Sequence, residues 1–245
     1  MVLNSTAGKI SKKLKIKGYS SSLSTGGNDG LMSAFYGYEI VKNRIHNHCL
    51  VGAGDEHSEL TSAIDKAYGL DNSEFPLTEG SSFLTLASLN EAETSGSKIY
   101  AELKGVGFAF DDRKDGFSNE PLEASIDQAL DRAGTTKDEI NFVFYNNDGR
   151  QKKMKNMQTG LSEIFSDNEV ICFNRHTGYG ESTSALNHLY LAAECIYSGL
   201  HVPNCSREIA ASIESPPLNK GLNQGLVVSS SVNGNFIAMV VGDVN

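Results

Sequence analysis

The sequence of 245 residues contains no tryptophan and has only 4 cysteines and 5 prolines. The cysteines Cys49, Cys172, Cys195 and Cys205 lie far apart, and no two of them have the C-x-x-C spacing of a redox pair or a zinc site. This distribution excludes a disulfide-rich scaffold. It is typical of the reduced thiols of a cytoplasmic protein.

Long apolar runs are also absent, so no segment is predicted to span a membrane. The first lysines are not followed by an apolar core and a cleavage site, so no signal peptide is expected. The chain also has no excess of basic residues. It contains 21 Lys and Arg against 30 Asp and Glu, which gives a net charge of −9. Binding to nucleic acid depends on neutralising phosphates. We therefore expect neither a membrane nor a nucleic acid as a partner.

Glycine is abundant, with 24 residues, and 39% of the chain is apolar, which is typical of a soluble globular protein with a real core. Short apolar runs alternate with segments of helical periodicity. This alternation predicts an α/β fold with a mainly parallel sheet. The predicted strands are 19–25, 46–56, 80–89, 98–110, 140–146 and 170–174, followed by a closing hairpin that turns at Asn233-Gly234.

Residues 80–89 and 98–110 are expected to pair with each other, because the residues between them have the composition of a hairpin loop. A helix is predicted over 118–134, where Ser118 is a favourable N-cap and Gly134 a favourable end. Another helix is predicted over 58–69, with Leu60, Ile64 and Ala67 at helical spacing.

The stretch "LSTGGNDGLMSAF", residues 23–35, has the pattern of an active-site turn. A β-type run ends in small residues and passes directly into an amphipathic helix, which is how an α/β fold presents a nucleophile at a helix N-terminus. The turn itself is Gly26-Gly27, so it contains neither a thiol nor a base.

Five stretches, taken in order, carry a resemblance to a known family. The stretch "AGKISKKLKIKGYSSSLSTGGNDGLMSAF" follows the order of a helix, "GIKGPS", a strand and "STACASG" with the catalytic Cys. "IHNHCLVGAGDE" resembles "ADVALAGGAE", and "INFVFYNNDGR" lies where the family has "NAHGTGT". "HTGYGESTSALNHL" resembles "TGHTLGAAGA", and "SSSVNGNFIAMVV" resembles the closing "SFGFGGTNASLV". Together they cover nearly the whole chain, which is therefore similar to the β-ketoacyl-ACP synthases of the thiolase-like fold.

The resemblance implies that the family's Cys-His-His set is absent. Gly27 lies at the cysteine position, Asn146 lies nearest the first histidine, and Tyr179 takes the position of the second. The family's lysine corresponds to Asn174 or Arg175. Gly27 cannot be acylated, Asn146 is a poorer partner for developing charge than imidazole, and a tyrosine with a pKa near ~10 is no base at neutral pH. We therefore expect vestigial positions and no catalytic residue, as in chain-length factors.

The fold implied by the resemblance is the layered α/β/α/β/α architecture of the thiolase-like proteins, with its N-terminal part truncated. Residues 1–110 would form a partial N-terminal half with the elbow at 24–30, and residues 111–245 the C-terminal half. Two explanations of the shortened half stay open. The chain is trimmed, or a partner supplies the missing strands.

The function implied by the resemblance is that of a non-catalytic subunit. It would pair with an active β-ketoacyl synthase in type II fatty-acid or polyketide biosynthesis, with aryl polyene or flexirubin pathways as the preferred setting. Pairing through residues 19–25 would cover an otherwise open sheet edge. A homodimer through the same segment and an acyl carrier protein as a further partner stay open, and no cofactor or metal is expected.

Alternatives from other functional classes also stay open. One is an acyltransferase or thioester hydrolase that uses Ser24 or Thr25, and another is an acyl- or carrier-protein-binding module that acts alone. A third places the nucleophile at one of the four cysteines. A metal site would use His46, His48, Cys49, Asp55 and His57. Two basic runs could dock an acidic carrier protein: Lys9, Lys12, Lys13, Lys15 and Lys17, and Arg150, Lys152, Lys153 and Lys155.

Overall fold

The computed structural model describes residues 5–112, 118–166, 168–199 and 221–244. Its larger sheet has five strands in the order β3-β7-β6-β4-β5, and β4 pairs in parallel with both β5 and β6. β7 pairs antiparallel with β3 and with β6, so the sheet is mixed, and the prediction of a mainly parallel sheet is wrong. The strands are β3 (Glu102–Phe110), β4 (Phe142–Asn146), β5 (Glu169–Ile171), β6 (Gln224–Ser230) and β7 (Asn235–Gly242).

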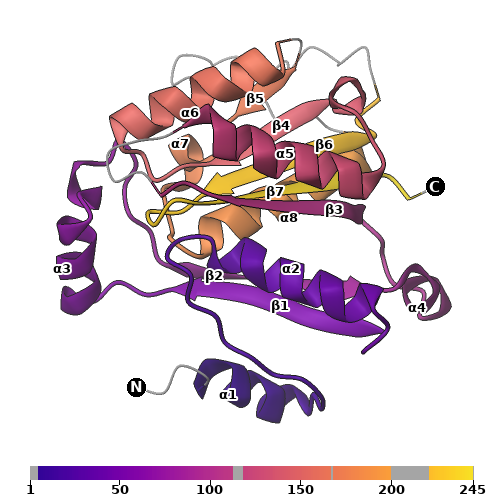
Figure 1. Ribbon diagram of the computed structural model, residues 1–245. Coiled ribbons are helices and arrows are strands. Elements are labelled where there is room, and N and C mark those ends of the chain that lie inside the picture. Colours follow the sequence, from indigo (N-terminus) through magenta and orange to yellow (C-terminus); the bar gives the residue numbers. More distant parts are fainter. Residues whose placement is uncertain (1–4, 113–117, 167, 200–220, 245) are drawn as a thin grey trace.

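Helices cover both faces of this sheet (Figure 1). α5 (Asn119–Ala133) and α6 (Gln151–Ile164) pack on one face, and α2 (Asp29–Lys42) and α8 (Thr183–Ser198) lie against the other. Successive residues of β4 point to opposite faces, so Val143 joins the first core and Phe144 the second. All five residues of β4 are buried, as expected for a strand covered on both faces.

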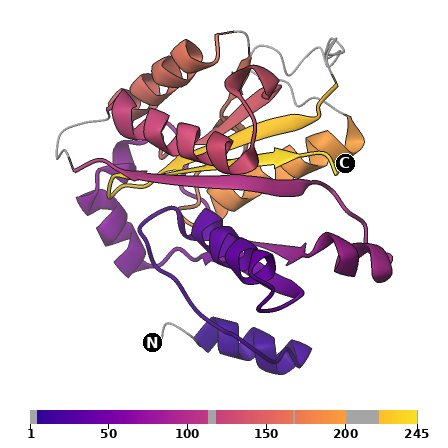
Figure 2. The same ribbon diagram turned by 45° about the vertical axis from the view of Figure 1, so that its right-hand side comes forward.

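A second sheet lies beyond α2 and α8. It consists of β1 (His48–Asp55) and β2 (Gly80–Ala87), paired antiparallel over eight residues. α1 (Ser5–Leu14) lies farthest from the five-stranded sheet in both views (Figures 1 and 2). The remaining elements are α3 (Glu59–Ala67), η1 (Leu70–Asn72), α4 (Leu89–Thr94), η2 (Lys137–Glu139) and α7 (Asn174–Thr177).

Two predicted strand features are wrong. Residues 80–87 pair with β1 and residues 102–110 pair with β7, and the residues between them form α4, which Ser88 caps by accepting a hydrogen bond from the Glu91 N–H. Both runs have strand-like patterns, and their partners are distant in sequence, so the hairpin composition was misleading. Residues 19–25 form no strand, because no neighbouring described strand pairs with their backbone.

The turn at Asn233-Gly234 is confirmed, since β6 and β7 form an antiparallel hairpin around it. The helix over 118–134 is also confirmed, with a capping bond to the Ser118 hydroxyl and with Gly134 in the left-handed region. β3, at the end of the predicted 1–110 half, lies in the sheet of the 111–245 half. The division into two halves stays a prediction. Within the described residues, no helix is both long and apolar enough to cross a membrane.

Candidate functional site

The elbow is built by two glycines in the left-handed region, with φ of 79° at Gly26 and 104° at Gly27. A side chain is strained at such angles, whereas glycine adopts them freely. α2 begins two residues later, and the Asp29 carboxylate turns back to accept hydrogen bonds from the backbone and the hydroxyl of Thr25. The expected turn before a helix is therefore present, although no strand enters it.

Tyr179 closes the space beside the elbow. Its hydroxyl oxygen lies 3.1 Å from the position that a β-carbon on Gly27 would occupy. The backbone of Tyr179 is held from both sides, because its N–H donates to Pro76 and its carbonyl accepts from Thr78. The side chain is 1% exposed, and its hydroxyl has no hydrogen-bond partner among the described residues.

Asn146 reaches the same elbow through a chain of buried side chains. Its amide donates to the Ser229 hydroxyl at 3.0 Å, and that hydroxyl donates to Asn28 Oδ1 at 2.6 Å. Asn28 follows Gly27 directly and also donates to the carbonyl of Asn235. The structure thus brings the three predicted positions together, with Tyr179 in direct contact and Asn146 linked through two other residues.

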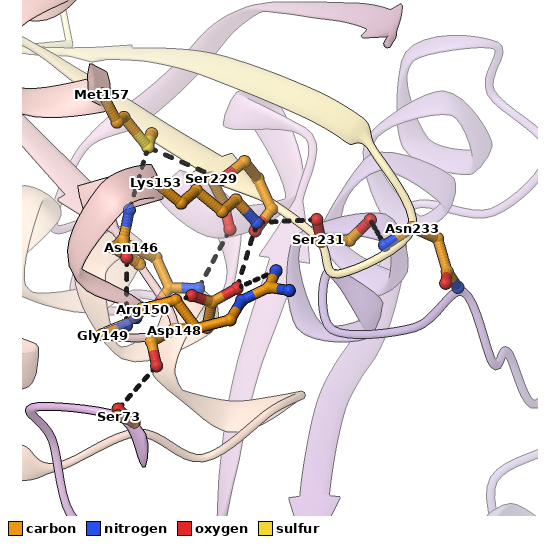
Figure 3. Close-up of polar contacts among 12 residues, drawn as sticks. Ser73, Asn146, Asp148, Gly149, Arg150, Lys153, Met157, Ser229, Ser231 and Asn233 are labelled. Carbon is orange, nitrogen blue, oxygen red and sulfur yellow. Dashed lines mark hydrogen bonds and ion pairs between the residues drawn. The ribbon is translucent and has the colours of Figure 1, made fainter. Parts of the chain in front are cut away.

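Asp148 is the residue that the sequence analysis missed. It is fully buried and accepts hydrogen bonds from Arg150 Nη2 at 2.8 Å and from Lys153 Nζ at 3.1 Å (Figure 3). Lys153 also donates to the carbonyl of Ser231 at 2.8 Å, so the ion pair holds the β6–β7 hairpin. A signal was present in the sequence. Aligning the glycine of "NAHG" with Gly149 of "NNDG" gives Asp148 as a second candidate for the histidine position, beside Asn146.

The cations of this network favour the ionised form of Asp148. Burial raises the pKa of Asp148, but the charge of Lys153 and the hydrogen bond and charge of Arg150 outweigh burial and leave the pKa below its usual value. Burial lowers the pKa of Lys153, and Asp148 opposes that shift. Burial, followed by the charges of Asp148 and Glu181, raises the pKa of Tyr179 well above its ordinary value. Tyr179 is therefore a neutral hydroxyl at physiological pH and is not a base.

Carboxylates gather on the other side of the elbow. Asp55, at the end of β1, accepts hydrogen bonds from the N–H groups of Ser182 and Thr183 and so caps α8. Glu181 is hydrogen-bonded to Asp65. Burial, the charge and hydrogen bond of Asp65, and then the charge of Asp55 raise the pKa of Glu181 to about 7. Glu181 therefore holds its proton, hydrogen-bonded to Asp65, until the pH approaches neutrality.

The position of the family's lysine is occupied by a structural amide. Asn174 is fully buried, accepts a hydrogen bond from the Asn147 N–H and donates to the carbonyl of Gly178. The exposed Arg175 lies over the ring of Phe75 instead. Neither side chain contributes a mobile cation to the elbow.

The cysteines offer no activated thiol among the described residues. Burial raises the pKa of Cys172 to about 12 and also raises the pKa of Cys49. Cys195 is 3% exposed, and Cys205 lies outside the described residues. A reactive cysteine needs a lowered pKa and exposure. None of the three described cysteines meets that requirement.

The other predicted sites are dispersed. Ser24 is exposed, and the hydroxyl of Thr25 donates to Asp29. Across the described ranges, no group of three or more His, Cys, Asp or Glu side chains could hold a metal ion. In the second basic run, Arg150 and Lys153 form ion pairs with Asp148. The lysines of the first run are exposed: Lys9, Lys12, Lys13, Lys15 and Lys17.

The chain was compared with known protein families, curated proteins and solved structures. No family model matches the chain. A curated relative, 3-oxoacyl-[acyl-carrier-protein] synthase 2 of Rhizobium meliloti, is 25% identical over 167 residues, which are 66% of this chain and 38% of the relative. The chain thus aligns with well under half the length of this relative.

Solved structures match over the full described architecture. The ishigamide ketosynthase/chain length factor gives a TM-score of 0.85 at 18% identity, covering 100% of this chain and 66% of the solved one. A type II PKS acyl-carrier protein in complex with its ketosynthase bound to the hexaketide gives 0.85 at 18%, covering 99% and 67%. The resemblance is thereby confirmed for the fold: this chain has the ketosynthase-like thiolase fold.

Proposed function

We propose that the protein is a catalytically silent, chain-length-factor-like subunit that pairs with an active β-ketoacyl synthase. The preferred setting is type II fatty-acid or polyketide biosynthesis of the aryl polyene or flexirubin kind. The proposal is consistent with the similarity to a ketosynthase/chain length factor and to a ketosynthase bound to its carrier protein.

One observation carries the proposal. At the elbow, Gly27 has no side chain to acylate, and the Tyr179 hydroxyl oxygen lies in tight contact, 3.1 Å from the position that a β-carbon on Gly27 would occupy. A condensing enzyme needs a thiolate to hold the acyl chain. Here the thiol is absent, and the bulky, neutral side chain of Tyr179 packs against the elbow in its place.

Both candidates for the first histidine position are equally unsuited to condensation. Stabilising a thioester oxyanion requires donors directed at the developing charge. The Asn146 amide donates to Ser229, and Asp148 is an anion held by Arg150 and Lys153. A buried carboxylate would repel an oxyanion. The site is therefore built for stability and not for turnover.

The two-stranded sheet supports a role for a partner. Among the described residues, β1 and β2 pair only with each other, so each has one edge without a neighbour. On the outer face, Leu50 is 37% exposed and Phe83 is 48% exposed. Open strand edges of this kind are normally blunted or covered, and a ketosynthase subunit would cover them.

The first experiment incubates the purified protein with acyl and malonyl thioesters and follows its intact mass and the release of carbon dioxide. We expect no adduct and no decarboxylation, whereas an active ketosynthase run in parallel gives both. A stoichiometric acyl adduct would contradict the proposal. Its mapped site would distinguish Ser24 or Thr25 from a cysteine.

The second experiment coexpresses the chain with an active type II ketosynthase and tests copurification and product length. Ser22→Pro removes a backbone donor at an exposed residue of segment 19–25, and Ser22→Thr is the matched control. We expect the proline variant to fold and to lose the ketosynthase. A protein that binds acyl-carrier protein but never a ketosynthase would instead be a binding module that acts alone.

A further inference from the structure

Helix α3 turns its apolar side chains away from the protein. Leu60, Ile64 and Tyr68 are 71%, 45% and 46% exposed, and their spacing of four residues places them in one stripe. The buried residue of this helix is Asp65, which is 5% exposed. A surface helix normally directs its apolar stripe at the core. The stripe of α3 therefore lacks a partner within the described chain.

The surroundings of this stripe are acidic. Residues 55–79 contain seven Asp and Glu and a single Lys. The carboxylates of this segment that are exposed to solvent include Glu56, Glu59, Glu74 and Glu79. An occupant of the stripe must therefore combine apolar side chains with positive charge.

α1 and the residues after it have that combination. Residues 1–28 contain five lysines and no Asp or Glu, and all five lysines are exposed and make no ion pair with a described residue. Next to them, Leu14 is 58% exposed and Ile16 is 44% exposed. α1 lies apart from α3 in both views, so the two surfaces do not meet within one copy (Figures 1 and 2).

We propose that α1 of one copy docks on the α3 stripe of a second copy of this chain. Leu14 and Ile16 would cover Leu60 and Ile64, and the lysines would lie against Glu56 and Glu59. A two-fold axis allows both contacts at once. The proposal does not rest on the silent-subunit function, because none of these residues belongs to the elbow.

The charge of the whole chain favours a second copy over a nucleic acid or an anionic membrane. The net charge of the whole chain is −9. Residues 1–17 contribute +5 through their five lysines and contain no Asp or Glu, so residues 18–245 carry −14. A second copy offers the lysines an acidic surface, whereas phosphates would be repelled by the rest of the chain.

The test measures mass by analytical ultracentrifugation at about 50 mM and about 500 mM salt. We expect the wild type to approach twice 26.4 kDa at low salt and to dissociate at high salt. Lys12→Glu with Lys13→Glu on α1, or Glu56→Lys with Glu59→Lys near α3, should raise the dissociation constant at least about tenfold. Lys155→Glu with Glu93→Lys, on α6 and α4, is the matched control and should leave it unchanged. Circular dichroism verifies that each variant folds.

Mixing the two reversed variants is the decisive step. In the mixed dimer the acidic α1 of one variant meets the basic α3 of the other, and the unchanged elements also match, so association should return to within about threefold of the wild type. Leu60→Ser with Ile64→Ser should weaken association at low salt, although neither substitution changes a charge. A monomer at all concentrations, equal effects of the control, or a mixture that stays monomeric would each overturn the proposal.

Discussion

The hydroxyl oxygen of Tyr179 lies 3.1 Å from the position of a β-carbon on Gly27, and this contact joins two positions that are 152 residues apart. Both the backbone angle of Gly27 and the tyrosine oppose a side chain at the elbow. The two effects can be separated, because only the second depends on the hydroxyl.

Gly27→Ala should lower the free energy of unfolding by about 1–3 kcal/mol, because φ is 104° and the new methyl group meets the tyrosine oxygen. In a Tyr179→Phe background the loss should be smaller, since the oxygen is gone. Urea unfolding of the four proteins gives the coupling energy. Equal losses in both backgrounds would show that backbone strain alone excludes the side chain.

Tyr179→Phe by itself should be neutral or stabilising. The buried hydroxyl has no hydrogen-bond partner among the described residues, so its removal breaks no bond and lowers the desolvation cost. Tyr190→Phe, on the exposed side of α8, serves as the comparison. A loss above about 1 kcal/mol would indicate that the Tyr179 hydroxyl is bonded in solution.

Asp148→Asn should destabilise the protein by about 3–5 kcal/mol, because it leaves the cations of Arg150 and Lys153 without their buried partner. Asp127→Asn breaks an exposed ion pair with Lys137 and should cost less than about 1 kcal/mol. Chemical unfolding at pH 7 measures both. Similar small losses would mean that the buried network contributes little.

The Asp148 contribution should also depend on pH. Its pKa is lower in the folded state than in the unfolded state, so its stabilisation is complete above an unfolded pKa of about 3.9 and is lost as pH falls through the folded pKa. The stability difference between the wild type and Asp148→Asn should therefore be constant from about pH 7 to pH 5 and shrink below about pH 4. A difference that shrinks near neutral pH would contradict this assignment.

Glu181 should act in the opposite direction. Its pKa of about 7 in the folded protein exceeds the unfolded value of about 4.3, so its stabilisation is complete below the unfolded value and is lost as pH rises toward 7. Glu181→Gln should gain stability relative to the wild type between about pH 5 and pH 8, and Glu163→Gln on α6 is the control. A pH-independent difference would show that burial and the neighbouring carboxylates do not raise the pKa of Glu181.

His188 should stay neutral across the physiological range, because burial lowers its pKa to about 4. Its Nε2 accepts from the Phe173 N–H at 3.1 Å, and its Nδ1 then donates to the Ser184 carbonyl. In nuclear magnetic resonance spectra, the ring signal of His188, identified by its loss in His188→Gln, should not titrate between about pH 5.5 and pH 8. Titration of that signal near pH 6.5 would rule out the buried placement.

The sequence by itself determined the features that depend on neighbouring residues. Alternating apolar periods predicted the α/β class, Ser118 and Gly134 marked the limits of α5, and Asn233-Gly234 marked the last hairpin. The absence of a thiol at Gly27 is likewise visible in the sequence. Capping, turns and periodicity act over a few residues, so a local pattern is sufficient to predict them.

Only the tertiary structure decided which elements meet. β2 pairs with β1, and β3 pairs with β7. The alternating pattern of each strand fits the observed partner as well as it fits the predicted hairpin, so the pattern alone cannot identify the partner. The contact of Tyr179 with Gly27, the burial of Asp148 and the outward stripe of α3 likewise depend on distant residues. The partners of a strand edge or of a buried charge come from residues far away in the sequence. Which residues these are depends on how the complete fold packs.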